Sequence, residues 1–224
     1  MRKALCSIGA GPHAALLDIS EPTFRAYAER HGYDLVVGRE ADPRRPPAWT
    51  KVRMLQQLLA EFEVVVWIDA DAVVVDGSVD IADELEPTAQ LGLVEHRRGD
   101  DRIPNTGVMV WRAGDFAHEL LAKVWAASRF IDHPWWENAA LVDALGYDVP
   151  RFNRLERLLP GRPRPCRRVR HSPYLDRTQF LAPEWNWAYL SRVENPRIVH
   201  CVGVPVQQRR ADMQAALEGR LGYA

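Results

Sequence analysis

The stretch that decides the fold is EVVVWIDADAVVVD, residues 63–76, in which two apolar runs flank a pair of aspartates. The first run, residues 64–68, is typical of a strand buried on both faces of a parallel sheet. Asp69 and Asp71 follow it, with only Ala70 between them. The pattern predicts a central strand whose carboxyl end carries two carboxylates, at the sheet edge where α/β proteins bind ligands.

Strand and helix patterns alternate on both sides of this stretch. Such alternation predicts an α/β fold, a mainly parallel sheet flanked by helices, and 224 residues are enough for a single domain with one good core. Strands are predicted at residues 3–8, 34–37, 91–95, 106–112 and 197–201, and helices at about 13–31, 49–62, 115–130, 135–145 and 212–221.

Composition limits the function classes. A formal net charge of −1 argues against nucleic-acid binding, which needs a marked basic excess. The basic run at residues 162–171 has two interpretations, a solvated loop or a site for an acidic substrate. Cys6, Cys166 and Cys201 are too scattered for a disulfide framework, and no signal or membrane-spanning segment is present in the sequence. We therefore expect a cytoplasmic protein.

Two carboxylates as close as Asp69 and Asp71 repel each other, so a cation must balance them or one must take a proton. On an extended backbone, side chains at i and i+2 point the same way and converge. A divalent ion such as Mn²⁺ or Mg²⁺ suits these oxygen ligands. The alternative, a surface turn with two acids, fits poorly between two apolar runs.

Four further motifs lie before and after this stretch, and their order along the chain resembles that of the GT-A glycosyltransferases. Among these, the chain resembles glycosyltransferase family 34, the galactosyl- and xylosyltransferase family. They are WTK at 49–51, NTGVMVWR at 105–112, WWENAALVDAL at 135–145 and HCVG at 200–203. The resemblance implies a GT-A, Rossmann-like fold, with a nucleotide-sugar and metal half at about 1–112 and an acceptor half at about 113–224. It also implies transfer of a hexose or pentose from a nucleotide-diphosphate sugar, with retention and with Mn²⁺ between the aspartates and the diphosphate.

His200 is the candidate third metal ligand. It ends the last predicted strand, and a neutral imidazole suits Mn²⁺. The matching histidine of the family's HxxG motif has this role, and Gly203 completes the motif here. A lone histidine at a strand end is more often structural, but the two aspartates and Gly203 favour the ligand.

The first predicted strand runs into SIGAGPHA, whose glycines have the GxGxxA spacing of a dinucleotide-binding turn. Such a protein also needs an acid at the end of its second strand. Asp34 begins that strand and Glu40 lies past its end, so dinucleotide binding is the weaker interpretation. In the GT-A family the first strand ends at the nucleotide, which assigns Ser7, Ile8 and Gly9 to a sugar nucleotide.

The remaining site residues are carried over from the family. Lys51 contacts the donor phosphate or sugar, or is a solvated lysine in a first helical turn; both interpretations stay open. Asn105 faces the donor or acceptor, and Glu137 and Asn138 match an acid-amide pair near the reacting carbon, although the amide is usually Gln. The predicted catalytic residues are Glu137, Asn138 and Asn105, and the predicted donor contacts are Ser7, Ile8, Gly9, Lys51, Asp69, Ala70, Asp71, Asn105 and Gly203.

Other points stay open in the sequence. Many relatives carry a lysine beyond the HxxG motif; here Arg209 or Arg210 would have to replace it. Four tryptophans are either sugar platforms or core residues: Trp135, Trp136, Trp185 and Trp187. The acceptor is a cytosolic small molecule, glycan or peptide, with no membrane anchor expected. A nucleotidyltransferase acting on sugar phosphates and a non-catalytic nucleotide or dinucleotide binder are the alternatives.

Overall fold

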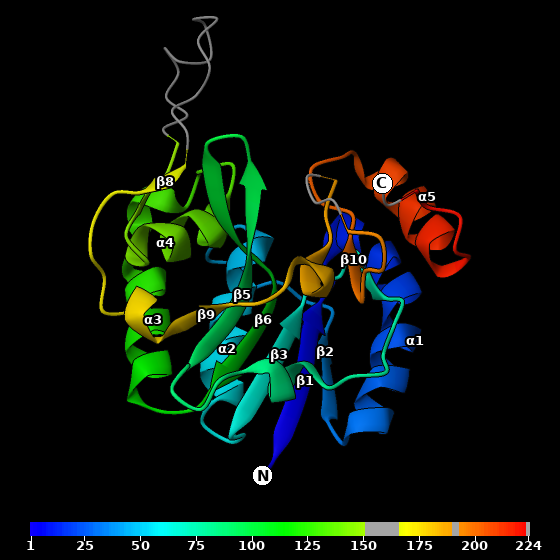
Figure 1. Ribbon diagram of the computed structural model, residues 1–224, viewed down its shortest axis with the longest axis horizontal. Coiled ribbons are helices and arrows are strands. Elements are labelled where there is room, and N and C mark those ends of the chain that lie inside the picture. Colours follow the sequence, from blue (N-terminus) through cyan, green and yellow to red (C-terminus); the bar gives the residue numbers. More distant parts are fainter. Residues whose placement is uncertain (151–165, 190–192, 223–224) are drawn as a thin grey trace, which may run out of the picture.

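A computed structural model describes residues 1–150, 166–189 and 193–222. Its centre is a six-stranded sheet of order β2-β1-β3-β6-β5-β9, which confirms the predicted sheet flanked by helices (Figure 1). β1 pairs in parallel with β2 and β3, β6 runs antiparallel between β3 and β5, and β9 pairs in parallel with β5. The strands are β1 (Lys3–Ile8), β2 (Asp34–Gly38), β3 (Val64–Ile68), β5 (Leu91–Arg98), β6 (Asp101–Arg112) and β9 (Thr178–Phe180).

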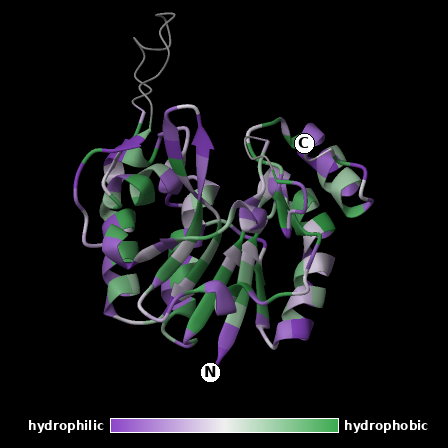
Figure 2. Cartoon of the chain, in the orientation of Figure 1, coloured by the Kyte–Doolittle hydropathy of each residue, from purple (hydrophilic) through white to green (hydrophobic). Residues whose placement is uncertain are grey.

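Helices cover both faces of this sheet because strand side chains alternate between the faces. In β1, Ala4 and Cys6 pack in the cluster that the second, third and fourth helices cover, whereas Leu5 packs in the cluster beneath the first helix. Figure 2 shows the apolar residues on the strands and the polar ones on the outer helix faces and on the tip of the β5–β6 hairpin. The helices are α1 (Ala14–His31), α2 (Thr50–Leu58), α3 (Asp115–Ala126), α4 (Trp136–Ala144) and α5 (Val206–Leu217).

The last predicted strand forms, but it lies outside the main sheet. β10 (Ile198–His200) pairs antiparallel with β4 (Ala72–Val74), a short strand directly after the aspartates. A third apolar cluster under α5 packs against this ribbon, and α5 begins at Val206 instead of residue 212. The ribbon brings the end of the chain back to the carboxyl end of β3.

The structure decides between interpretations that the sequence left open. Trp185 and Trp187 are 2% and 3% exposed and belong to the core, whereas Trp136 is 43% exposed. Of the basic run, residues 162–165 lie outside the described residues. Its Arg167 and Arg168 form the exposed strand β8, which pairs with β7 (Tyr147–Asp148). In the part of the chain that the structure describes, no helix is both long and apolar enough to cross a bilayer.

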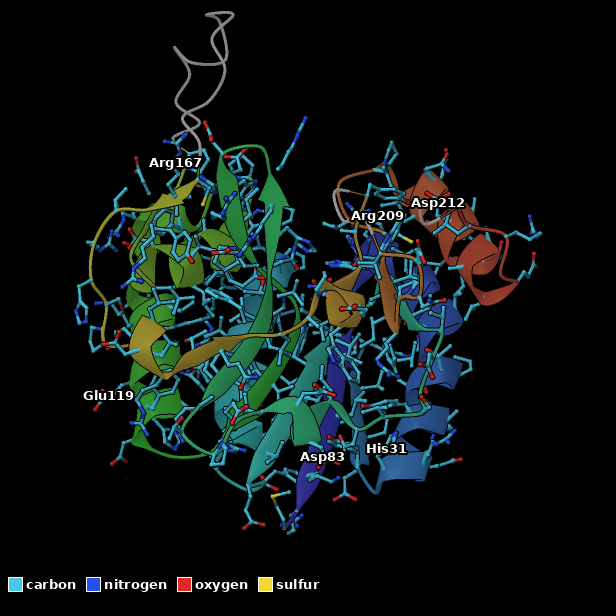
Figure 3. All side chains as sticks on the ribbon, in the orientation of Figure 1. His31, Asp83, Glu119, Arg167, Arg209 and Asp212 are labelled. Atoms are coloured by element: carbon cyan, nitrogen blue, oxygen red, sulfur yellow. The ribbon has the colours of Figure 1, made fainter. Side chains whose placement is uncertain are left out.

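Figure 3 orients the two ends of the sheet. Arg209 and Asp212 of α5 lie at the end toward which β1 and β3 run, and Asp83 lies at the opposite end.

We expect Leu5→Ala to lower the free energy of unfolding by roughly 2–5 kcal/mol, because Leu5 is fully buried in the middle of β1 and its loss leaves a cavity. The control is Leu217→Ala at the end of α5, where the side chain is 42% exposed and the change should stay within about 0.5 kcal/mol. Urea denaturation of both variants measures the difference. Equal losses would mean that the core is not where the structure has it.

Candidate metal centre at the end of strand β3

The two aspartates lie on a tight turn between β3 and β4. The Asp69 amide donates to the Gly107 carbonyl at 2.7 Å, and the Ala72 amide donates to the Asp69 carbonyl at 3.0 Å. The expectation of an extended backbone here is therefore wrong. The carboxylates still converge, because the turn folds Asp71 back beside the end of the strand.

Backbone pairing places His200 next to these aspartates. In the β4–β10 ribbon His200 is opposite Ala72, one residue after Asp71, and the Cys201 amide donates to the Asp71 carbonyl at 2.9 Å. The His200 amide also donates to the Trp187 carbonyl at 2.7 Å. His200 thus reaches the site from the far end of the sequence through main-chain hydrogen bonds.

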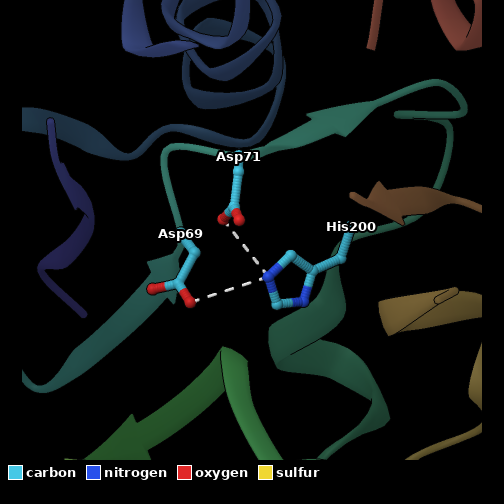
Figure 4. A group of neighbouring side chains, drawn as sticks. All are labelled: Asp69, Asp71 and His200. Carbon is cyan, nitrogen blue, oxygen red and sulfur yellow. Dashed lines mark ion pairs between the residues drawn. The ribbon is translucent and has the colours of Figure 1, made fainter. Parts of the chain in front are cut away.

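The three side chains point at one another (Figure 4). His200 Nε2 lies 3.2 Å from Asp71 Oδ1 and 3.7 Å from Asp69 Oδ2, and the nearest ligand atoms all fall within 4.8 Å of one another. His200 and Asp71 are buried, while the Asp69 side chain is 26% exposed. Despite the nearby oxygens, Nε2 has no hydrogen-bond partner among the residues that the structure describes. A buried nitrogen without a hydrogen bond, facing two carboxylates, is a donor set that fits a divalent cation.

Each carboxylate also has its own cation. Lys51 Nζ lies 2.9 Å from Asp69 Oδ1, and Arg209 Nη1 lies 2.6 Å from Asp71 Oδ2. Trp67 adds a hydrogen bond from Nε1 to Asp69 Oδ1 at 2.6 Å. Burial would raise the pKa of Asp71, yet His200, when its ring is protonated, and Arg209 hold that pKa well below its usual range. The charge balance that the sequence requires is supplied from α2 and α5.

Lys51 is buried, so its interpretation as a solvated lysine is wrong. Besides Asp69, its ammonium donates to Glu137 Oε1 at 2.9 Å and to the Thr106 carbonyl at 3.1 Å. Burial lowers the pKa of Lys51, but Asp69 and Glu137 outweigh it and hold that pKa above its usual range. The lysine connects α2, β3, β6 and α4 at one point.

The predicted catalytic residues lie around this lysine. Glu137 is buried in the first turn of α4, and burial raises the pKa of its carboxyl. Asn138 Oδ1 accepts the Thr106 amide at 2.9 Å. Asn105 Oδ1 accepts the Gly107 amide at 2.8 Å and the Asn186 side-chain amide at 2.9 Å. Asn138 and Asn105 thus hydrogen-bond to the backbone of β6 beside the aspartates. Contact of these residues with a sugar stays a prediction.

The predicted nucleotide contacts lie at the end of β1. Ser7 is fully buried, and among the described residues its hydroxyl has no hydrogen-bond partner. Gly9 has a packing role, because a Cβ there would lie 2.5 Å from Leu17 Cβ of α1. Ala70 is buried in the aspartate turn, and Gly203 has a left-handed φ of +85° that favours glycine.

Sequence reasoning missed one residue of the site. Asn186 is fully buried, and its Oδ1 lies 3.0 Å from His200 Nδ1. It stands between the two tryptophans of the EWNW stretch, where only the aromatic residues drew attention. Arg209 was one of two candidates for a cation, and the structure places it at Asp71 while Arg210 is exposed.

Comparisons with known proteins agree with this geometry. Residues 10–98 match the model of the galactosyl transferase GMA12/MNN10 family, which is less than half of the chain. No curated protein matches the sequence. The resemblance to that family therefore covers Lys51 and the aspartate turn, but neither β1 nor His200.

Solved structures match over nearly the whole chain. A glycosyltransferase involved in the glycosylation of the major capsid of PBCV-1 superposes with a TM-score of 0.67 at 15% identity, over 96% of this chain and 99% of that one. The galactosyltransferase LgtC, in complex with donor and acceptor sugar analogs, gives 0.57 at 10% identity over 97% and 100%. GlyE of Streptococcus pneumoniae TIGR4 gives 0.58 at 11% identity over 98% and 63%. The predicted GT-A fold is confirmed, and fold and family match together support a glycosyltransferase.

We expect Lys51→Met to lower the free energy of unfolding by roughly 3–5 kcal/mol, because it leaves Asp69 and Glu137 without their buried cation. Chemical denaturation measures this loss, with the exposed Lys123→Met as the control.

The loss should depend on pH with a defined sign. A buried carboxyl such as Glu137, with a raised pKa, holds its proton more tightly when folded, so its contribution falls as the pH rises above the unfolded value of about 4.3. Removing Lys51 enlarges this effect, so Lys51→Met should be more damaging near about pH 7 than near about pH 5. A loss that is independent of pH would contradict the ion pair.

Proposed function

We propose that the protein is a metal-dependent, retaining glycosyltransferase that transfers a hexose or pentose from a nucleotide-diphosphate sugar to an acceptor. The observation that carries this proposal is the buried His200 Nε2, which forms no hydrogen bond and faces Asp69 and Asp71 at the carboxyl end of β3. That edge of an α/β sheet is where ligands bind. The GT-A fold supports the class of reaction.

Asp69, Asp71 and His200 would hold Mn²⁺ or Mg²⁺. Two carboxylate oxygens and an imidazole nitrogen suit such an ion and leave positions for the diphosphate of the donor. When bound, the ion supplies Lewis acidity that stabilises the leaving diphosphate. The chain's own residues must hold the nucleotide and the sugar and keep the charges balanced.

Arg209 is the cation that we assign to the leaving diphosphate. This chain lacks the lysine that many relatives carry just beyond the HxxG motif, and the Arg209 guanidinium reaches the site from α5 instead, 2.6 Å from Asp71 and 3.3 Å from His13 Nε2. An arginine fork suits phosphate oxygens. Arg210 is exposed on the same helix and serves as the comparison residue.

The donor would lie along the carboxyl ends of β1 and β3. Its base and ribose are assigned to the backbone of Ser7, Ile8 and Gly9, and the remaining contacts to Lys51, Asn105, Ala70 and Gly203. Lys51 pairs with both Asp69 and Glu137 at 2.9 Å, so we assign it a contact with the donor next to Asp69. The same ammonium holds the Glu137 carboxylate in place.

The retaining course is supported by the state of the nearby acids. An inverting enzyme needs a carboxylate that is free to act as a base. Glu137 pairs with Lys51 at 2.9 Å, and Asp143 pairs with Arg170 at 3.1 Å. We propose instead that the leaving phosphate takes the acceptor proton. Glu137, Asn138 and Asn105 then stabilise electrostatically the positive charge that develops on the sugar in the transition state. The cytosolic acceptor and the cytoplasmic location stay predictions.

Asp71→Asn should abolish the Mn²⁺-dependent stabilisation of the protein by a nucleotide sugar and lower turnover by about 10³-fold, because several kcal/mol of leaving-group stabilisation are lost. Thermal shift with a panel of nucleotide sugars, with and without Mn²⁺, measures the first effect. Asp83→Asn at the opposite end of the sheet is the matched control (Figure 3). Full activity in EDTA would overturn the metal dependence.

A second prediction concerns stereochemistry. From an α-linked donor, the first product should carry an α-configured anomeric centre, which proton NMR of the early reaction mixture reports. Asn138→Ala should slow the chemical step by roughly 10²–10³-fold, as for other positioned polar groups, with little change in donor affinity. A β-configured product would mean inversion, and donor turnover without any acceptor product would favour a hydrolase.

A further inference from the structure

A chain of hydrogen bonds runs from the Gly107 amide through Asn105 and Asn186 to the ring of His200. We infer that Asn186 is a positioning residue that keeps the proton of His200 on Nδ1 and so leaves Nε2 unprotonated toward Asp69 and Asp71. The inference rests on the proposed metal site for its functional meaning. The evidence for it is the direction of each hydrogen bond between Gly107 and His200.

The chain of hydrogen bonds begins at a main-chain N–H, which can only be a donor. The Gly107 main-chain amide can only donate, and it lies 2.8 Å from an Asn105 side-chain atom, which must therefore be the oxygen. The Asn186 side chain approaches that same oxygen at 2.9 Å, so Asn186 presents its NH₂ group there. A peptide N–H thus determines the orientation of two asparagine amides.

The far end of Asn186 then faces the histidine. Its oxygen lies 3.0 Å from His200 Nδ1, and an oxygen can only accept, so Nδ1 carries the hydrogen. A neutral imidazole has one ring hydrogen, and Nε2 is left with its lone pair toward the carboxylates. This agrees with the absence of a hydrogen bond at Nε2, although Asp71 Oδ1 is only 3.2 Å away.

Burial prevents water from replacing these hydrogen bonds. Asn186 is fully buried and His200 is 2% exposed, so water cannot take over at Nδ1 without a structural change. The ring also packs directly on Gly107, because a Cβ there would lie 2.1 Å from His200 Cε1 and 2.4 Å from Nδ1. Only glycine leaves room for the ring in this position.

The tautomer decides whether the site can take a metal. With the hydrogen on Nε2, His200 would donate to Asp71, and both would be lost as ligands. With the hydrogen on Nδ1, Nε2 is available, and the Asn186 oxygen increases its basicity. Outer partners of metal-binding histidines affect metal affinity by roughly 10–100-fold.

Two substitutions separate the hydrogen bond from packing. Asn186→Leu removes the acceptor at Nδ1, whereas Asn186→Gln keeps both the amide oxygen and the NH₂ group. Asn195→Leu changes an exposed asparagine and is the control. Each protein is examined without metal by nitrogen-15 NMR of the histidine rings, at a pH where the His200 ring is neutral, and then titrated with Mn²⁺ alone.

We expect the wild type, Asn195→Leu and Asn186→Gln to show an unprotonated Nε2 at His200. Asn186→Leu should show a mixture of tautomers and roughly 10–100-fold weaker Mn²⁺ binding. A protonated Nε2 in the wild type, or unchanged tautomer and Mn²⁺ affinity in Asn186→Leu, would overturn the inference. If Asn186→Leu does not fold, the wild type and Asn186→Gln decide it by the tautomer at His200. The NMR result needs no metal, so it stands apart from a failure of the proposed enzyme.

Discussion

The repulsion between two carboxylates at the end of a buried strand is the constraint on which the site depends. Asp69 and Asp71 cannot both be ionised in this position without cations, and the fold supplies two. Lys51 comes from the helix that precedes β3, and Arg209 comes from the last helix of the chain. The same pair of aspartates therefore connects α2 with α5 through ion pairs.

Gly107 is the second point through which the site is built. Its carbonyl accepts the Asp69 amide, its amide orients Asn105, and its missing Cβ leaves room for the His200 ring. One residue of β6 thus sets the position of an acidic ligand and the orientation of the histidine. A buried network of this kind is stable only when every member has its partner, which gives Asn186 a role beyond filling space.

The fold and the heart of the site could be predicted from the sequence because they depend on local patterns. The apolar run before Asp69 predicted the central strand, and the resemblance of the motifs to the GT-A family implied that architecture, which the structural comparison confirms. His200 was expected at Asp69 and Asp71, and the structure brings the three together. The same patterns disfavoured a turn at the aspartates, because apolar runs on both sides indicate an extended backbone.

By itself, the sequence determined the order of strands and helices, the pair of aspartates and the histidine that ends the last strand. Only the tertiary structure decided what surrounds them: that Lys51 is buried between Asp69 and Glu137, that Arg209 and not Arg210 reaches Asp71, and that Asn186 stands behind His200. The reason is physical. Secondary structure follows from periodicity along the chain, whereas burial, ion pairing and the direction of a hydrogen bond depend on residues that are distant in sequence and meet only when the sheet and its helices are packed.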